Sequence, residues 1–190
     1  IINAMATHPQ VQKQAQEEID RVIGKDRLPT YDDRPKLPYI EAVLRETLRW
    51  RPVTPLGFFH AALNDDIVNG YTVPKGTPIA ANIWAMTRDE PVYPEPESLI
   101  PERFLTENGT CNDDEMVFIF GFGRRICPGR RLALESMWAG IALVLAAFDI
   151  TKAKDEAGNE MDIDVVYSDD VVSIMPRSDK ARALVSGLAA

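Results

Sequence analysis

Cysteine, histidine and long apolar runs are all scarce in this chain of 190 residues. Two cysteines in a chain of this length do not form a disulfide framework. The two cysteines and two histidines also lack the spacing of a zinc site, which needs about four ligands. The longest uncharged apolar run, 136–148, is shorter than the roughly 20 residues of a membrane-spanning helix and predicts a buried one.

Basic residues are outnumbered by acidic ones, which gives a formal net charge of -8. Such a surface repels phosphate groups, so nucleic acid is excluded as an expected partner. The chain begins at Ile1, and no charged stretch leads into an apolar run, so we expect no signal peptide here and a missing upstream region.

The apolar periodicity predicts a mainly α-helical chain with a small β-region in its middle. The strongest strand signal is Asn69-Gly70 between β-prone runs, which is typical of a hairpin. Thr7 to Gln10 has the spacing of a helix capping box. The expected elements are helices over 9–23, 38–51 and 130–148, a short strand over 77–81, a turn or helix around residue 84, and a hairpin over 165–175.

The stretch FGFGRRICPG, residues 120–129, places Cys127 in a glycine-rich loop just before the last predicted helix. Unpaired N–H groups and the helix dipole at that position favour the ionised thiolate. A papain-like nucleophile is not indicated, because both histidines lie upstream. A phosphate loop is not indicated either, because no Gly-Lys-Ser/Thr sequence follows. A buried structural cysteine remains an alternative.

The residues around Cys127 favour a further interpretation, a thiolate that ligates haem iron. Phe120, Gly123, Arg125, Cys127 and Gly129 have the spacing F-x-x-G-x-R-x-C-x-G. Such a ligand needs a loop stripped of side chains, N–H donors near the sulfur and a cation for the haem propionates. The window supplies all three.

This window, with two further motifs, resembles the haem-thiolate monooxygenases of the cytochrome P-450 family. The family has an E-x-x-R helix, here Glu46 to Arg49, and a P-E-R-F segment, here 101–104, whose arginine is Arg103. The resemblance extends over nearly the whole chain and is strongest to fungal members. It implies that 1–190 is one partial domain, the C-terminal portion of the cytochrome P-450 fold (α+β).

The resemblance also implies roles for individual residues. Cys127 would be the catalytic axial ligand of the haem iron, with Phe120 packed near its sulfur. Arg125 would neutralise one haem propionate, and His60 would meet the other. Glu46, Arg49 and Arg103 would be structural. Gly123 and Gly129 belong to the haem-binding window, and the candidate substrate contacts are Val53, Thr54, Leu56 and Phe58.

The implied partners are a small apolar substrate and an NADPH-dependent reductase, which would dock on Arg124, Arg130 and Arg131. For a full-length protein the resemblance implies the cytoplasmic face of the endoplasmic reticulum membrane, reached through an N-terminal anchor outside this chain. The oxygen-activating helix of the family would also lie before Ile1. Two alternatives stay open: a non-catalytic haem-binding fragment, and a helical interaction domain with a structural cysteine.

Overall fold

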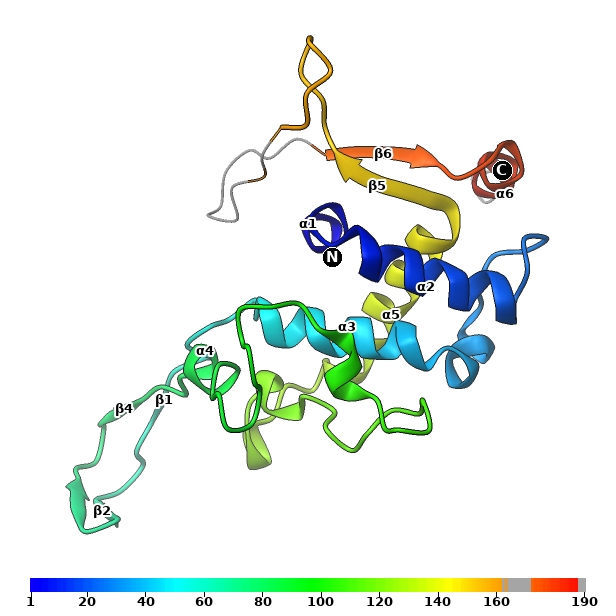
Figure 1. Ribbon diagram of the computed structural model, residues 1–190. Helices are drawn as coiled ribbons and strands as arrows, with labels where there is room; N and C mark the ends of the chain where they lie inside the picture. Colours follow the sequence, from blue (N-terminus) through cyan, green and yellow to red (C-terminus); the bar gives the residue numbers. More distant parts are fainter. Residues whose placement is uncertain (162, 164–171, 188–190) are drawn as a thin grey trace.

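The computed structural model describes residues 1–161, 163 and 172–187. A body of helices carries a two-stranded sheet on one side, and a long arm projects from the other (Figure 1). No helix within the described ranges is both long and apolar enough to cross a bilayer. The body contains α1 (Ile2–Thr7), α2 (Pro9–Val22), α3 (Pro38–Trp50) and α5 (Arg130–Ala147).

The predicted starts of the two proline-led helices are confirmed, because Pro9 and Pro38 are each the first residue of a helix. The capping box predicted for Thr7 is wrong. Thr7 is the last residue of α1, which the periodicity did not reveal, and its hydroxyl donates to the carbonyl of Asn3 at 2.7 Å. His8 is the N-cap of α2, and its ring meets that of Trp50 edge-on.

The core lies where α2, α3 and α5 pack together. α3 crosses its centre, and ten of its thirteen residues are buried, so it is covered on nearly all sides. The 3-10 helix η1 (Tyr31–Lys36) leads into α3, and Trp138 of α5 is buried against Tyr31, with ring centroids 6.1 Å apart. The main buried side chains are Val11, Ile19, Ile40, Val43, Leu44, Leu48, Trp138, Ile141 and Leu145.

The C-terminal sheet differs from the prediction. α5 ends at Ala147, one residue before the predicted end at 148, because β5 (Phe148–Lys152) begins there. β5 pairs antiparallel with β6 (Val172–Pro176). Of the predicted hairpin over 165–175, residues 165–171 lie outside the described residues. The rest belongs to β6, which pairs with β5. α6 (Asp179–Gly187), which the sequence reading missed, follows β6.

Two glutamines of α2 complete the free edge of β5. The side chain of Gln12 donates to the carbonyl of Ile150 at 2.9 Å and accepts from its N–H at 2.8 Å. Gln16 donates to the carbonyl of Phe148 at 3.1 Å. Gln12 is buried, so these bonds replace water for backbone groups that would otherwise have no partner.

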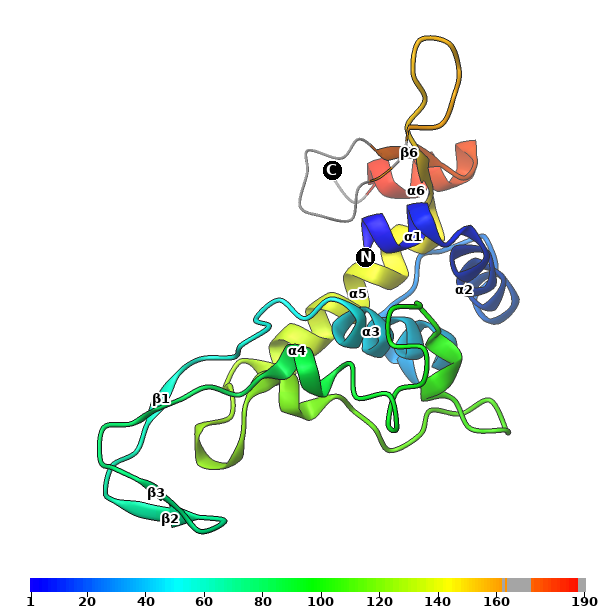
Figure 2. The ribbon, with the colours of Figure 1, turned by 60° about the vertical axis from the view of Figure 1, so that its left-hand side comes forward.

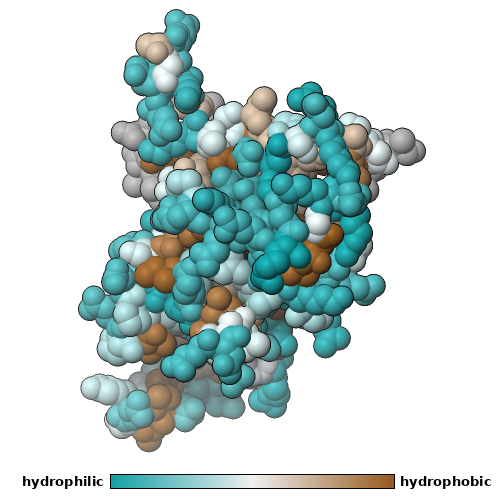
Figure 3. Space-filling view, turned by 45° about the vertical axis from the view of Figure 1, so that its right-hand side comes forward, coloured by the Kyte–Doolittle hydropathy of each residue, from teal (hydrophilic) through white to brown (hydrophobic). Residues whose placement is uncertain are grey.

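The predicted β-region is confirmed and forms the projecting arm (Figure 2). β2 (Asp66–Val68) and β3 (Tyr71–Val73) pair across Asn69-Gly70, whose φ angles are 51° and 83°. β1 (His60–Ala61) pairs with β4 (Pro78–Ile79), which is shorter than the predicted strand, and α4 (Ile83–Met86) follows. Apolar side chains reach the surface of the arm and of the body, where they interrupt the hydrophilic surface (Figure 3).

Replacing Gln12 by alanine leaves one buried N–H and one buried C=O of Ile150 unpaired. We expect the free energy of unfolding to fall by about 2 kcal/mol, because an unsatisfied buried polar group costs roughly 1–3 kcal/mol. Gln14 lies two residues along the same helix and is exposed, so Gln14→Ala is the matched control. Chemical denaturation measures both variants, and equal midpoints would contradict the importance of the edge bonds.

Candidate functional site

The cysteine loop, residues 120–129, begins at the end of the short 3-10 helix η3 (Val117–Phe120). It contains a second short 3-10 helix, η4 (Gly123–Arg125), and ends at the start of α5. The N–H of Cys127 donates to the carbonyl of Phe120 at 2.8 Å, which closes the loop. Gly121 and Gly123 have φ angles of 90° and 54°, in the left-handed region that other residues rarely adopt. The glycines are therefore required by the path of the backbone.

The two cysteines lie in different surroundings. Cys127 is exposed, and a Cβ added at Gly129 would lie 3.8 Å from its sulfur, so glycine keeps that side of the thiol open. Cys111 is half-buried, and its thiol donates to the carbonyl of Pro38 at 3.5 Å. Burial raises the pKa of the Cys111 thiol. Of the two, only Cys127 is available to a ligand.

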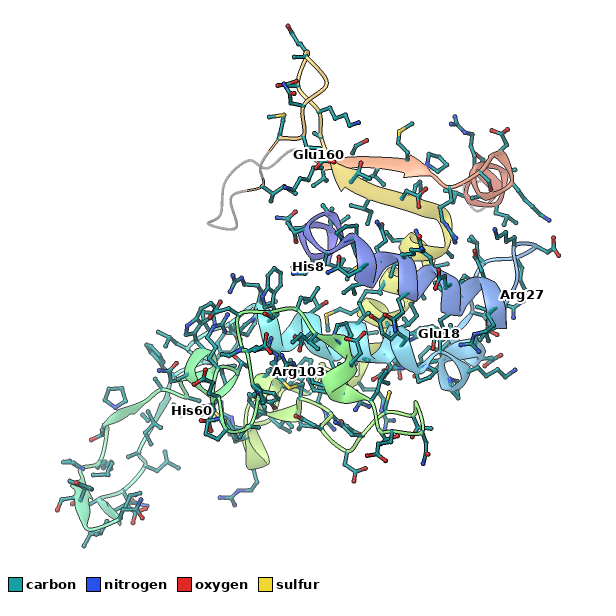
Figure 4. All side chains as sticks on the ribbon, viewed as in Figure 1. His8, Glu18, Arg27, His60, Arg103 and Glu160 are labelled. Atoms are coloured by element: carbon teal, nitrogen blue, oxygen red, sulfur yellow. The ribbon has the colours of Figure 1, made fainter. Side chains whose placement is uncertain are left out.

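A cavity of about 670 Å³ opens at Cys127 and lies between the cysteine loop, α5 and the segment that leads into the arm. This volume is within the range of roughly 300–1,000 Å³ typical of ligand and cofactor sites. His60 lies at the inner end of the arm, beside the body (Figure 4). Seven predicted site residues line the cavity: Cys127, Phe120, Arg125, His60, Val53, Thr54 and Phe58.

Three of the residues predicted to contact haem or substrate lie outside this lining. Gly123 and Gly129 shape the loop behind it, while Leu56 has half of its surface exposed to solvent. The structure adds lining residues that sequence reasoning missed. Two of them, Ala133 and Met137, could have been found from their position on the apolar face of α5. The others have no local pattern. The added residues include Phe59, Ala81, Ile83, Phe122, Ala133 and Met137.

The lining of the cavity suits a largely apolar group with an acidic edge. Its wall is mostly aliphatic and aromatic, whereas Arg125 and His60 supply groups suited to carboxylates. The exposed sulfur of Cys127 also lies in this wall, and a cysteine thiolate is one of the protein ligands that hold haem iron. The residues present therefore fit a haem.

Glu46, Arg49 and Arg103 meet behind the cavity, at the centre of the molecule. The Glu46 carboxylate accepts from Arg49 at 2.7 and 2.8 Å and from Arg103 at 3.3 Å. The side chains of Glu46 and Arg49 are fully buried, and that of Arg103 is 11% exposed. Arg103 approaches from η2 (Pro101–Phe104), beside α3 (Figure 4).

The buried guanidinium of Arg49 has every donor satisfied. Besides its two bonds to Glu46, Nη1 donates to the carbonyls of Thr87 and Pro96, both at 2.9 Å, and Nη2 donates to that of Ser98 at 3.0 Å. These five bonds use all five N–H groups of an arginine. The N–H of Ile100 also donates to Glu46, at 2.8 Å. Two buried side chains, Arg49 and Glu46, thus hold the irregular segment 87–100 against α3.

The three arginines near Cys127 lie at the loop and the first turn of α5. Arg124 and Arg131 are exposed, and Arg130 is half-buried. Arg124 belongs to η4, and Arg130 and Arg131 are the first residues of α5, so all three lie close to Cys127 along the chain. A positive patch on an otherwise acidic chain is suited to an acidic partner.

Comparison with known proteins places the chain in a family. The cytochrome P450 family model matches residues 1–172. The chain is 46% identical over 190 residues to cytochrome P450 monooxygenase claR of Ampulloclitocybe clavipes, covering 95% of this chain and 35% of that protein. It is 43% identical to cytochrome P450 monooxygenase 176 of Postia placenta, covering 96% of this chain and 37% of that protein. For cytochrome P450 monooxygenase yanC of Aspergillus niger the identity is 45%, with 86% and 32% covered.

The chain belongs to the cytochrome P450 family, and its structure is part of the cytochrome P450 fold. It spans about a third of the length of these fungal relatives. The predicted family and fold class are therefore confirmed.

Removing the Glu46 carboxylate leaves the Arg49 guanidinium uncompensated in the core. We expect Glu46→Ala to lower the free energy of unfolding by roughly 3–5 kcal/mol, as breaking a buried ion pair does. Glu17→Ala is the matched control. Glu17 pairs with Lys13 on the same kind of helix turn but in solvent, where a pair contributes about 0.5 kcal/mol. Denaturation of the haem-free chain measures both, and equal losses would contradict the burial of the network.

Proposed function

We propose that residues 1–190 form the haem-binding part of a monooxygenase that inserts one oxygen atom of O2 into a small apolar substrate. The observation that carries this proposal is the exposed thiol of Cys127 at an apolar cavity, in a chain of the cytochrome P450 family. In this proposal Cys127 is the axial ligand of the haem iron. Haem, when bound, supplies the redox chemistry that activates dioxygen.

The residues around the thiol would bind and orient the haem. Arg125 would donate to one propionate and His60 to the other, which fixes the rotation of the ring within the cavity. Phe120 would cover the sulfur and limit its contact with water. Gly123 and Gly129 would keep side chains away from the haem face. Arg125, His60 and Phe120 all line the same cavity, which supports these roles.

The substrate would lie against Val53, Thr54 and Phe58. Val53 is 87% exposed and Phe58 is 80% exposed, so both have apolar surface to offer a ligand. All three also line the same cavity as Cys127. Leu56 lies outside that lining and is not part of the proposed contact set.

Electrons would come from an NADPH-dependent reductase that docks on the basic residues Arg124, Arg130 and Arg131, of which Arg124 and Arg131 are exposed. Electrostatic complementarity between this patch and an acidic partner would orient the encounter. By family, the full-length protein would be attached to the endoplasmic reticulum membrane on its cytoplasmic face.

A second candidate function, non-catalytic haem binding by this chain alone, is favoured by one observation. A second apolar cavity of about 760 Å³ adjoins the first, and the two share Leu48, Val53 and Met137. None of the residues of the cysteine loop, 120–129, lines this second cavity. We therefore assign the complete reaction to a protein of the relatives' length, and weak haem binding to residues 1–190.

The test of the proposal compares the two cysteines. Haem-reconstituted Cys127→Ser should lose the strongly red-shifted Soret band that reduced, carbon monoxide-bound haem gives with a thiolate ligand. Cys111→Ser should retain it, because that thiol is half-buried against Pro38. Absorption spectra of the wild-type chain and both variants are the measurement. Equal loss in the two variants, or a retained band in Cys127→Ser, would contradict the assignment of the ligand.

A further inference from the structure

Beside the haem cavity, two tryptophans and two arginines stack in one cluster. The guanidinium of Arg88 lies 3.1 Å from the ring centre of Trp84. The guanidinium of Arg51 lies 5.5 Å from the same ring and 4.7 Å from that of Trp50. Cations within about 6 Å of an aromatic ring are attracted to its face. We call these four side chains the Trp84 cluster.

Arg88 is the member of the Trp84 cluster with the most directed bonds. Its Nε donates to the carboxylate of Glu97 at 2.9 Å, and its Nη2 donates to the carbonyl of Trp50 at 2.9 Å. Its Nη1 donates to the hydroxyl of Thr87 at 3.1 Å. The side chain is only 10% exposed, and burial lowers the pKa of Arg88. A planar guanidinium can stack on a ring and make these bonds at once, which a lysine cannot.

The cluster is joined on one side to the buried ion network. Thr87 is fully buried, and its carbonyl accepts from Arg49, the guanidinium that pairs with Glu46. Its hydroxyl donates to the carbonyl of Trp84 and accepts from Arg88. Thr87 is therefore held by Arg49 through its carbonyl and by Arg88 through its hydroxyl.

On its other side the cluster is joined to the cavity wall. The N–H of Trp84 donates to the carbonyl of Pro55 at 2.8 Å. Pro55 lies between Thr54 and Phe58, which line the cavity, and Ile83 next to Trp84 lines it too. A Cβ at Gly57 would lie 3.8 Å from Ile83, so this segment packs closely on α4.

From this arrangement we propose that Arg88 is a positioning residue: by stacking on Trp84 it holds the segment 53–58 at the haem cavity in register with the buried Glu46–Arg49 network. Arg88 itself does not line the cavity. Its effect on a ligand passes through the Trp84 N–H and the carbonyl of Pro55. The inference rests on the proposed function only for the identity of that ligand.

The first measurement is amide hydrogen exchange in the haem-free chain, with Arg88→Lys compared with wild type. The Trp84 N–H should exchange about tenfold faster, because loss of the stack and of the three bonds favours local opening. The Ile100 N–H, bonded to Glu46, is the internal reference and should change by less than about twofold. Arg182→Lys, at an exposed position on α6, is the matched control and should change neither.

Equal acceleration of the Trp84 and Ile100 amides would mean that Arg88 contributes only to global stability, and it would overturn the proposal. So would an unchanged Trp84 amide. This readout needs no haem, so it decides the role of Arg88 even where haem binding fails.

The second measurement is titration of the same variants with hemin, which tests the link to the cavity. We expect Arg88→Lys to bind hemin about three- to tenfold more weakly than wild type, and Arg182→Lys to bind it equally well. Unchanged hemin affinity in Arg88→Lys would overturn the link. If the wild-type chain bound no hemin, the proposed function would fail, whereas the exchange result would still decide the positioning role.

Discussion

The carboxylate of Glu46 is a full negative charge held away from water, and the architecture of the chain follows from how it is neutralised. A buried charge is tolerated only when it is paired and its remaining hydrogen-bonding capacity is used. Two guanidinium groups and the N–H of Ile100 meet this requirement. The remaining N–H groups of Arg49 need acceptors of their own. The carbonyls of the segment 87–98, which has no regular secondary structure, accept from them. The ion network thus orders a part of the chain that cannot order itself.

The same network reaches the cysteine loop through packing. Arg103 belongs to η2, whose Phe104 is buried in a small cluster with Tyr93 and Met116. Met116 immediately precedes η3 and has a φ angle of 53°, so the chain turns sharply there towards Cys127. Arg45 of α3 adds bonds to the carbonyls of Asn112 and Asp114 on the same path. The position of the cysteine is therefore set by α3, although Cys127 and α3 are far apart in sequence.

The sequence predicts those features whose determinants are close together in the chain. The spacing of Glu46 and Arg49 is local and predicts a pair on one helix face, which the structure contains. The ten-residue window of Cys127 is also local and predicts a glycine-rich loop ahead of a helix, and the loop does lead into α5. Asn69-Gly70 is a local signal as well, and its hairpin is confirmed. Arg103 is grouped with Glu46 and Arg49 only by family resemblance, because its contact with Glu46, distant in sequence, leaves no local pattern.

Other features were not predicted from the sequence, for identifiable reasons. Any residue has a backbone carbonyl, so the sequence does not indicate which carbonyls, such as that of Thr87, accept hydrogen bonds from Arg49. Gln12 reads as a solvent-facing polar residue, whereas it is buried against β5. Phe148 continues the apolar pattern of α5 without a stop signal, which hid the start of β5. The stack of Arg88 on Trp84 at i and i+4 had a local signal that could have revealed it.

The central claim is that Cys127 ligates a haem iron in the cavity that Cys127, Arg125 and His60 line. The most direct test is iron-edge X-ray absorption of the haem-loaded chain, which detects the elements bound to the metal. The account predicts one sulfur ligand in addition to the haem nitrogens, and loss of that sulfur in Cys127→Ser. An iron coordinated by nitrogen and oxygen alone in the wild-type chain would contradict it.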